Sequence, residues 1–264
     1  MHIGVGPWGQ NYLKSYKAFP ITVSIATRDS WRAMLDDRPA GVVICTPPQT
    51  HIEIAQFALE RDIPVMIEKP LAPSLDEGKL LSGYVAPILV DHLYLFTHGY
   101  QELKRNVEEK NIHSIETIGM GTKSHEDHSV LWDYAPHDIS MILDLMGCVP
   151  DVVSVKKVLT SNLIFEMELH FGNIVTNSRF GVGEKRERKV SVKYENGEDS
   201  FEDIVGNEVP GPLHNAIGVF LSAIEGKPDQ RLGLGLSLEV LRVLEACEKS
   251  LVSGAFITFE KTHE

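Results

Sequence analysis

The chain opens with a glycine-rich loop, Gly4-Val5-Gly6-Pro7-Trp8-Gly9, that follows a short apolar stretch. We expect a strand at 2–5 before the loop and a helix at 7–18 after it, which is the setting in which G-x-G-x-x-G binds a dinucleotide. The first glycine permits a tight turn, the second lets the backbone approach a pyrophosphate, and the third lets helix and strand pack closely. The predicted cofactor contacts here are Gly4, Gly6, Pro7, Trp8 and Gly9. The alternative is a glycine-rich turn with no ligand.

Strand-like and helix-like segments alternate from this loop to about residue 91. The pattern predicts strands at 21–26, 41–45, 65–68 and 87–91, and helices at 31–35, 52–61 and 75–83. Such alternation indicates a parallel, doubly wound sheet of the α/β class. We therefore expect a Rossmann dinucleotide-binding domain over residues 1–91.

The interval from Thr27 to Thr46 is short for this fold, with room for one short helix and one strand. In the strand order 3-2-1-4-5-6, the unit without room is strand three, which lies at an edge. A parallel sheet survives this loss because the neighbouring strand becomes the new edge. We expect a Rossmann domain that lacks one edge strand and therefore has a thinner pocket for the adenine of the cofactor.

After residue 91 the predicted strands and helices no longer alternate one by one. The pattern predicts helices at 100–110, 132–146, 213–224 and 236–250, and strands at 115–123, 152–158, 163–171, 174–180, 188–194 and 255–259. Strands in series followed by helices indicate an α+β domain on an open, mostly antiparallel sheet. We assign residues 92–264 to a domain for substrate binding and oligomerisation.

The composition narrows the class of protein. A net charge of −12 over 264 residues argues against a nucleic-acid surface. It does not argue against an anionic cofactor, which backbone amides can bind. Three widely spaced cysteines show no disulfide or zinc pattern and favour a reducing cytoplasm. No apolar run approaches the roughly 20 residues that span a membrane, and the first strand leaves no room for a signal peptide.

The end of the second predicted strand should decide between the two nicotinamide cofactors. NAD enzymes usually place an acid there, whereas NADP enzymes favour an arginine. Here Thr27 takes the acid's position and Arg28 follows it, which favours NADP(H). Asp29 keeps NAD open, and the alternative for Arg28 is a solvated loop charge.

Three further segments complete a family pattern. They are Ile44-Cys45-Thr46-Pro47-Pro48-Gln49-Thr50-His51, Glu68-Lys69-Pro70-Leu71-Ala72 and Trp132-Asp133-Tyr134-Ala135-Pro136-His137-Asp138. With the first loop, they resemble the glucose–fructose oxidoreductase and inositol dehydrogenase family (Gfo/Idh/MocA), as a short member. The resemblance implies a Rossmann domain, a second domain whose open sheet mediates oligomerisation, and hydride exchange between nicotinamide and a secondary alcohol of a sugar, cyclitol or sugar derivative.

Lys69 is the strongest catalytic candidate. Its ammonium can hold a substrate hydroxyl and stabilise negative charge that develops on the oxygen. We expect Glu68 to orient this loop or to contact the nicotinamide, and the resemblance implies a cis bond between Lys69 and Pro70. The alternative is a surface lysine before a proline.

Thr46, Pro47 and Pro48 follow a buried strand at its carboxyl end, where ligands bind in open α/β sheets. The prolines should rigidify the loop beneath the cofactor. His51 begins the next helix, and the resemblance implies a place near the cofactor. The alternative is a capping or packing histidine.

Asp133 and His137 are four residues apart, so a helix would place them on one face. Pro136 indicates that this helix begins nearby. The resemblance implies that His137 is the general acid/base and that Asp133 binds substrate or tunes the histidine. The alternative is a capping aspartate and a core histidine.

Two further expectations complete the sequence analysis. His125, Asp127 and His128 with the preceding pair match no metal motif, so no metal is expected. We expect a homodimer or homotetramer through the C-terminal sheet. The competing functions are a noncatalytic nucleotide-binding or assembly protein, and a lyase or glycosidase that uses nicotinamide as a transient redox relay.

Overall fold

The computed structural model describes residues 1–123, 129–158, 161, 163–203, 210–227, 229, 231 and 233–259. The chain divides into two compact units. The first comprises Met1–Phe96 and Pro210–Leu241, and the second comprises Thr97–Val209 and Arg242–Glu264.

A five-stranded parallel sheet forms the centre of the first unit. Its order is β2-β1-β3-β4-β5. The strands are β1 (His2–Ile3), β2 (Ile25–Ala26), β3 (Val42–Ile44), β4 (Val65–Glu68) and β5 (Ile88–Asp91). Every residue of β3, β4 and β5 is buried, as is usual for parallel strands that helices cover on both faces. The α/β class with a Rossmann-type sheet is confirmed.

The shortened edge of this sheet is also confirmed. Between β2 and β3 the described chain contains only the short helix α2 (Trp31–Asp36), and β2 is the terminal strand. The sheet persists because β1 pairs with β3 on its other side.

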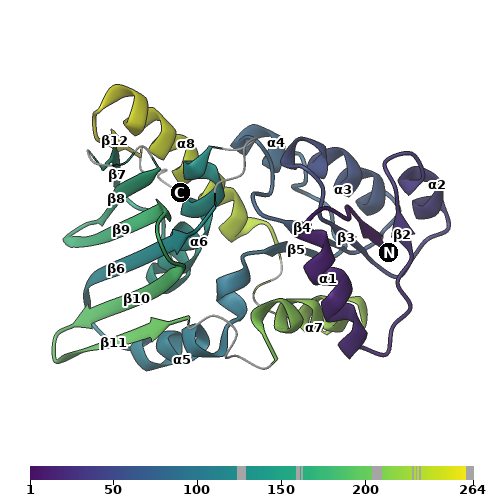
Figure 1. The fold of residues 1–264 in the computed structure, drawn as a ribbon, viewed down its shortest axis with the longest axis horizontal. Coiled ribbons are helices and arrows are strands. Elements are labelled where there is room, and N and C mark those ends of the chain that lie inside the picture. The colour runs from purple at the N-terminus through teal and green to yellow at the C-terminus, as the bar shows by residue number, and fades with distance from the viewer. Residues whose placement is uncertain are drawn as a thin grey trace. The chain divides into compact units, whose positions relative to one another are not determined.

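Helices cover both faces of the first sheet (Figure 1). On one side lie α2, α3 (His51–Leu59) and α4 (Leu75–Lys79), and on the other lie α1 (Gly9–Ser15) and α7 (Pro212–Ile224). Three short 3-10 helices, η1 (Tyr16–Ala18), η2 (Pro48–Thr50) and η3 (Leu93–Phe96), follow α1, β3 and β5.

Residues 210–241 differ from the expected division of the chain, which placed them in the second domain. The ring of His214 in α7 stacks on Phe19 with centroids 4.3 Å apart. A Cβ added at Gly41 would meet Ile224 and Phe220 of the same helix. These apolar contacts bury α7 against the first unit, to which the chain returns after it has formed the second sheet.

The second unit is built on a seven-stranded sheet of order β11-β10-β6-β9-β8-β7-β12. Its strands are β6 (Ile112–Gly121), β7 (Val152–Lys157), β8 (Ile164–Phe171), β9 (Ile174–Val182), β10 (Glu187–Tyr194), β11 (Gly197–Glu202) and β12 (Ile257–Thr258). Only β6 and β9 pair in parallel, so the predicted mostly antiparallel sheet is confirmed. A turn at Glu195-Asn196 leads from β10 into β11, a strand that the sequence analysis did not predict.

One face of this sheet packs under helices. They are α5 (His98–Val107), α6 (Val130–Met146) and the end of α8 (Gly235–Ser253) (Figure 1). Burial alternates along the strands. In β8, for example, Phe165, Met167 and Leu169 are buried, whereas the intervening Glu166 and Glu168 are only partly so.

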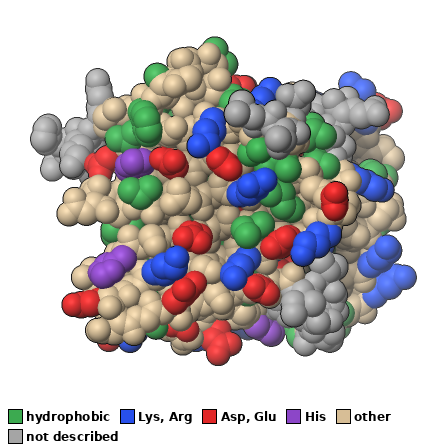
Figure 2. Space-filling view, turned by 60° about the vertical axis from the view of Figure 1, so that its left-hand side comes forward, with side chains coloured by type: hydrophobic (Ala, Val, Ile, Leu, Met, Phe, Trp, Pro, Cys, Tyr) green, Lys and Arg blue, Asp and Glu red, His purple; other side chains and the backbone are tan. Residues whose placement is uncertain are grey.

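The opposite face of the second sheet is open and charged. Acidic and basic side chains are interspersed across it (Figure 2). Four ion pairs link its strands: Lys193–Glu116 at 3.1 Å, Lys189–Glu202 and Lys156–Glu166 at 3.3 Å, and Arg179–Glu166 at 3.6 Å. Exposed pairs of this kind contribute little stability individually.

Two further features complete the description of the fold. Cys45, Cys148 and Cys247 are all free thiols. None of the described helices combines the length and the apolar character needed to cross a lipid bilayer.

Candidate functional site

The loop after β1 has three glycines with different surroundings. Gly4 has φ of +100°, and a Cβ there would lie 2.1 Å from the carbonyl oxygen of Cys45. A Cβ at Gly9 would lie 2.1 Å from the carbonyl oxygen of Gly4, whereas one at Gly6 would meet nothing within 4 Å. Packing therefore requires Gly4 and Gly9. The open space at Gly6 suits a ligand that approaches the backbone, so the loop fits a dinucleotide.

His2 lies beneath this loop and is fully buried. Its Nε2 is 2.7 Å from the Gly4 carbonyl oxygen and its Nδ1 is 2.9 Å from the Tyr16 hydroxyl. The Nε2–H thus donates to the carbonyl, and Nδ1 accepts from the hydroxyl. Burial lowers the pKa of His2, which favours this neutral form. The sequence analysis took His2 only as the start of a strand and missed its support of the loop.

The residues predicted to choose the cofactor follow β2 in an exposed turn. The backbone N–H of Thr27 donates to the Ser30 hydroxyl oxygen at 2.9 Å, and the two hydroxyls lie 3.0 Å apart. Arg28 is exposed and no described strand lies beyond β2. This edge of the sheet is therefore open, and the Arg28 side chain is exposed beside it.

The loop after β3 contains Thr46, Pro47 and Pro48, followed by His51 at the start of α3. The His51 ring is completely buried. Its Nε2 lies 2.8 Å from the carbonyl oxygen of Thr46, and its Nδ1 lies 3.1 Å from that of Pro70. His51 thus connects two loops through their backbones. Both of its ring nitrogens therefore face carbonyl groups of the loops that they connect.

Glu68 ends β4 and joins the first loop to Lys69. The indole N–H of Trp8 and the hydroxyl of Tyr12 both donate to its Oε1, the latter at 2.8 Å. The backbone N–H of Lys69 donates to Oε2 at 3.1 Å. The Lys69–Pro70 bond is cis and the Lys69 side chain is half-buried. These contacts give Glu68 the loop-orienting role, one of the two roles expected for it.

Tyr12 also contacts a second buried acid. Its hydroxyl oxygen lies 2.6 Å from Oδ2 of Asp91, the last residue of β5. Asp91 is 1% exposed, and burial and the charge of Glu68 raise its pKa well above the usual value. From the sequence, Asp91 was expected only as the end of the strand at 87–91, and Tyr12 only as part of the helix at 7–18. An acid at the carboxyl end of a buried parallel strand was the available signal.

His92 follows Asp91 and is 4% exposed. Its Nε2 lies 3.0 Å from the hydroxyl oxygen of Ser237. Burial, together with the nearby Lys69 cation, lowers the pKa of His92 to about 4. The imidazole is therefore neutral at physiological pH.

In the second unit, Asp133 and His137 lie one turn apart on α6, and both are half-buried. The helix begins at Val130, so Asp133 is in its first turn and its backbone N–H donates to the Ser129 carbonyl oxygen at 3.0 Å. Pro136 lies within the helix. The two candidate side chains therefore share one helix face.

A buried ion pair adjoins His137, and the sequence analysis missed it. Nη1 of Arg188 in β10 lies 2.7 Å from Oδ1 of Asp138 in α6. The two side chains are 4% and 0% exposed. This pair connects the helix that carries His137 to β10, the second strand from one edge of the second sheet.

The metal alternative rested partly on His125, Asp127 and His128, which lie outside the described residues. Among the residues that are described, no group of three or more His, Cys, Asp or Glu side chains is arranged to hold a metal ion.

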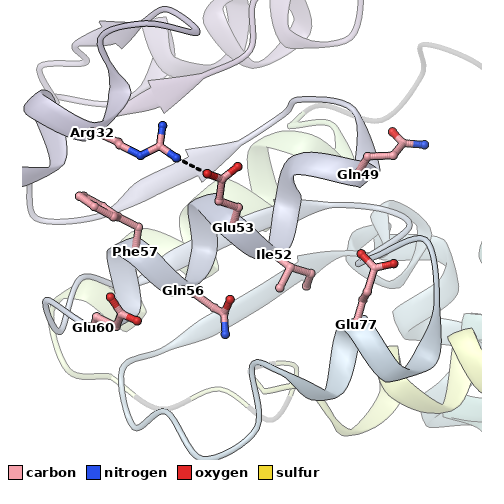
Figure 3. A pocket seen from close by; sticks show the side chains of 8 residues that line it. All are labelled: Arg32, Gln49, Ile52, Glu53, Gln56, Phe57, Glu60 and Glu77. Atoms are coloured by element: carbon pink, nitrogen blue, oxygen red, sulfur yellow. Dashed lines mark hydrogen bonds and ion pairs between the residues drawn. The ribbon is translucent and has the colours of Figure 1, made fainter.

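A separate open groove lies between α2, α3 and α4 (Figure 3). The carboxylates of Glu53, Glu60 and Glu77 line it, and Arg32 pairs with Glu53. None of the predicted cofactor residues lines this groove. Its excess of negative charge is unsuited to a pyrophosphate.

Comparisons with known proteins agree with this geometry. The model of an oxidoreductase family with an NAD-binding Rossmann fold (GFO_IDH_MocA) matches residues 3–85. The chain is 36% identical over 73 residues to inositol 2-dehydrogenase from Renibacterium salmoninarum. That match covers 26% of this chain and only 22% of the relative's length.

Two solved structures extend the likeness to the whole fold. A protein from Magnetospirillum magnetotacticum, provisionally assigned as an oxidoreductase, has a TM-score of 0.84 at 25% identity, covering 93% of this chain and 98% of that one. The scyllo-inositol dehydrogenase of Lactobacillus casei, with bound NAD(H) and scyllo-inositol, has a TM-score of 0.84 at 13% identity, covering 97% of each chain. Residues 3–85 thus resemble the NAD-binding Rossmann domain of the Gfo/Idh/MocA oxidoreductases, and the solved structures show that the chain shares their overall fold.

Proposed function

We propose that this protein is an NAD(P)-dependent dehydrogenase or reductase that acts on the CH–OH group of a sugar, cyclitol or sugar-nucleotide-like substrate. One observation carries the proposal. Glu68 joins the glycine-rich loop, through Trp8, to the backbone of Lys69. A dinucleotide loop and a lysine are thereby fixed to the same carboxylate. The relatives that act on inositols support the substrate class.

The cofactor would be held by Gly4, Gly6, Pro7, Trp8 and Gly9, with Thr46, Pro47 and Pro48 beside it. When bound, its nicotinamide accepts or donates the hydride. The open space at Gly6 admits the pyrophosphate, and His51 and His2 hold the surrounding loops. The exposed Arg28 after Thr27 favours NADP(H), whereas the family description and the relative with bound NAD(H) support NAD.

The residues have separate roles in the proposed reaction. Lys69 binds the substrate oxygen and stabilises the negative charge that develops there. His137 accepts the hydroxyl proton in oxidation and returns it in reduction, which suits an imidazole near neutral pH. Asp133, one turn away on α6, orients this histidine or the substrate.

A binding experiment and a matched pair of lysine variants test the proposal. We expect NADPH and NADH to quench the fluorescence of Trp8, with tighter binding of NADPH, and W8F identifies the contribution of this residue. K69M should keep cofactor binding and lose turnover. K79M is the control, because Lys79 is 54% exposed and forms a surface ion pair with Asp76. A wild-type protein that binds neither cofactor would favour the noncatalytic alternative, which is based on the missing edge strand.

Turnover with no net change in a copurified cofactor would instead indicate the lyase or glycosidase alternative. This outcome is distinguished by isolating the protein with its cofactor and measuring the ratio of oxidised to reduced nicotinamide before and after the reaction.

We further infer that the open face of the second sheet associates with another copy of the chain, as a homodimer or homotetramer. The interspersed charges can pair between copies, and the half-buried Ile118 and Met120 lie on the same face as these charges. We expect light scattering to give a dimer or tetramer, which I118K should convert to monomers. V85K, at a residue that is 96% exposed in the first unit, should leave the oligomer intact.

A further inference from the structure

We propose that Glu68 and Asp91 share a single proton, carried by Asp91, and that neutral Asp91 is a positioning residue for the glycine-rich loop and Lys69. The importance of this arrangement for the reaction rests on the proposed function. The proton itself is argued from the geometry of three buried oxygen atoms.

The oxygen atoms belong to Tyr12, Asp91 and Glu68. The Tyr12 hydroxyl oxygen lies 2.6 Å from Oδ2 of Asp91 and 2.8 Å from Oε1 of Glu68. A phenol has one hydrogen and can fully donate to only one of these oxygens. If both acids were ionised, the other contact would set oxygen lone pairs against each other in a buried place. A proton on one acid makes both contacts hydrogen bonds.

The surrounding donors decide which acid carries this proton. Glu68 accepts from the Trp8 indole, the Tyr12 hydroxyl and the Lys69 backbone, so its anion is well solvated by the protein. Asp91 contacts the Tyr12 hydroxyl and the Glu68 carboxylate, and its buried Oδ1 has no hydrogen-bond partner among the described residues. The resulting order is Asp91 Oδ2–H to Tyr12 Oη, and Tyr12 Oη–H to Glu68 Oε1.

The charges near Glu68 and Asp91 also indicate that the two acids hold one proton between them. The Lys69 cation is close enough to act on both acids and lowers the pKa of each, while burial raises both. The other titratable neighbours are His92, whose pKa is lowered by burial, and Cys45 and Tyr16, whose pKa values are raised by burial, so all three are uncharged. One carboxylate and one ammonium leave the cluster without net charge, whereas two buried carboxylates would leave one uncompensated.

The second unit contains a natural contrast. Tyr100 donates to Oδ2 of Asp144 at 2.7 Å, and Oδ1 of the same aspartate lies 2.7 Å from the Lys104 ammonium. The Tyr100 hydroxyl also lies 3.1 Å from the carbonyl oxygen of Met141, but it contacts only one carboxylate, and a cation lies at the other oxygen of that carboxylate. Asp144 is therefore the comparison for Asp91, which shares its tyrosine with a second acid.

Infrared difference spectroscopy tests the proton directly and needs neither cofactor nor substrate. At neutral pH we expect the carbonyl stretching band of a protonated carboxylic acid, sensitive to H₂O/D₂O exchange, in the wild type and in D144N. The band should be absent from D91N. A wild type without this band, or a band that survives in D91N and disappears in E68Q, would overturn the assignment.

The positioning role is tested by the indole N–H resonance of Trp8, identified by its loss in W8F. The amide of D91N can donate to Tyr12 as the acid does, so this resonance should stay in place. It should move in D91A and Y12F, which break the chain of hydrogen bonds, but not in D144N. The positioning role would be refuted if the Trp8 resonance moved as far in D91N as in D91A, or if it kept its wild-type position in D91A. Near-UV circular dichroism confirms that each variant is folded.

These readouts separate the inference from the proposed function. Absence of turnover in the wild type would contradict the proposed oxidoreductase activity and leave the infrared band and the resonance unaffected. Where turnover is found, we expect D91N to retain it within about threefold, and D91A to lose about tenfold in cofactor affinity, equivalent to about 1.4 kcal/mol.

Discussion

Substituting Gly6 by alanine separates a ligand-binding role of the first loop from a packing role. The added Cβ would meet no protein atom within 4 Å, and the backbone there does not have a positive φ. A compatible Gly→Ala change restricts the unfolded chain and stabilises a protein by about 0.4–1 kcal/mol. We therefore expect the melting temperature of G6A to stay the same or to rise slightly. If a pyrophosphate lies against this backbone, the methyl group will displace it.

The expected loss of affinity for NADPH or NADH is at least about tenfold, which corresponds to about 1.4 kcal/mol. Fluorescence titration gives the dissociation constant, and thermal melting of the same sample gives the stability. A stable G6A protein with wild-type affinity would refute the argument that this loop holds the cofactor.

Gly9 supplies the contrasting variant. Its added Cβ would lie 2.1 Å from the Gly4 carbonyl oxygen, so the two atoms must separate by about 1 Å or more to reach ordinary contact. Overpacking of this kind costs about 1–3 kcal/mol. G9A should therefore melt at a lower temperature without any ligand, which G6A should not do.

Three other predictions concern stability. Since the unfolded chain protonates His92 near its ordinary pKa of 6.5 and the folded chain only near 4, stability should fall by roughly 3 kcal/mol as the pH drops through this window, and urea titrations of H92Q should show a smaller fall. R188M leaves the buried Asp138 without its cation and should cost about 3–5 kcal/mol in chemical denaturation, whereas the double variant R188M/D138L should recover most of this loss. S74A removes the side chain that accepts from the Glu77 backbone N–H at 3.2 Å at the start of α4, and should cost about 1 kcal/mol of unfolding free energy.

Local patterns in the sequence predicted much of the fold. The alternation of strand-like and helix-like segments and the glycine loop identified the parallel sheet, because both are local features of the sequence. The short interval between Thr27 and Thr46 correctly predicted the missing edge strand, since a chain cannot form a helix, a strand and a second helix in so few residues.

Long-range contacts were not predictable in the same way. Nothing local shows that α7 returns to the first sheet, because an apolar helix face does not specify which sheet buries it. Tyr12 and Asp91 are far apart in sequence and each looks ordinary alone, yet they meet at 2.6 Å. The same reason applies to Asp138 and Arg188, whose pairing depends on how α6 lies across β10.

The return of the chain to the first unit governs how the protein is assembled during synthesis. A fragment that ends at Phe96 contains all five strands of the first sheet but lacks α7, and it would expose to water the apolar surface that Phe220 and Ile224 cover near Gly41. The second sheet also needs the C-terminal part of the chain to be complete. Ser250 accepts from the Val155 backbone N–H at 3.0 Å, and β12 pairs with β7. Almost the entire polypeptide must therefore leave the ribosome before either unit can complete its fold. A premature stop codon after β11 would disable both units at once, and neither can be excised as an uninterrupted piece of the gene.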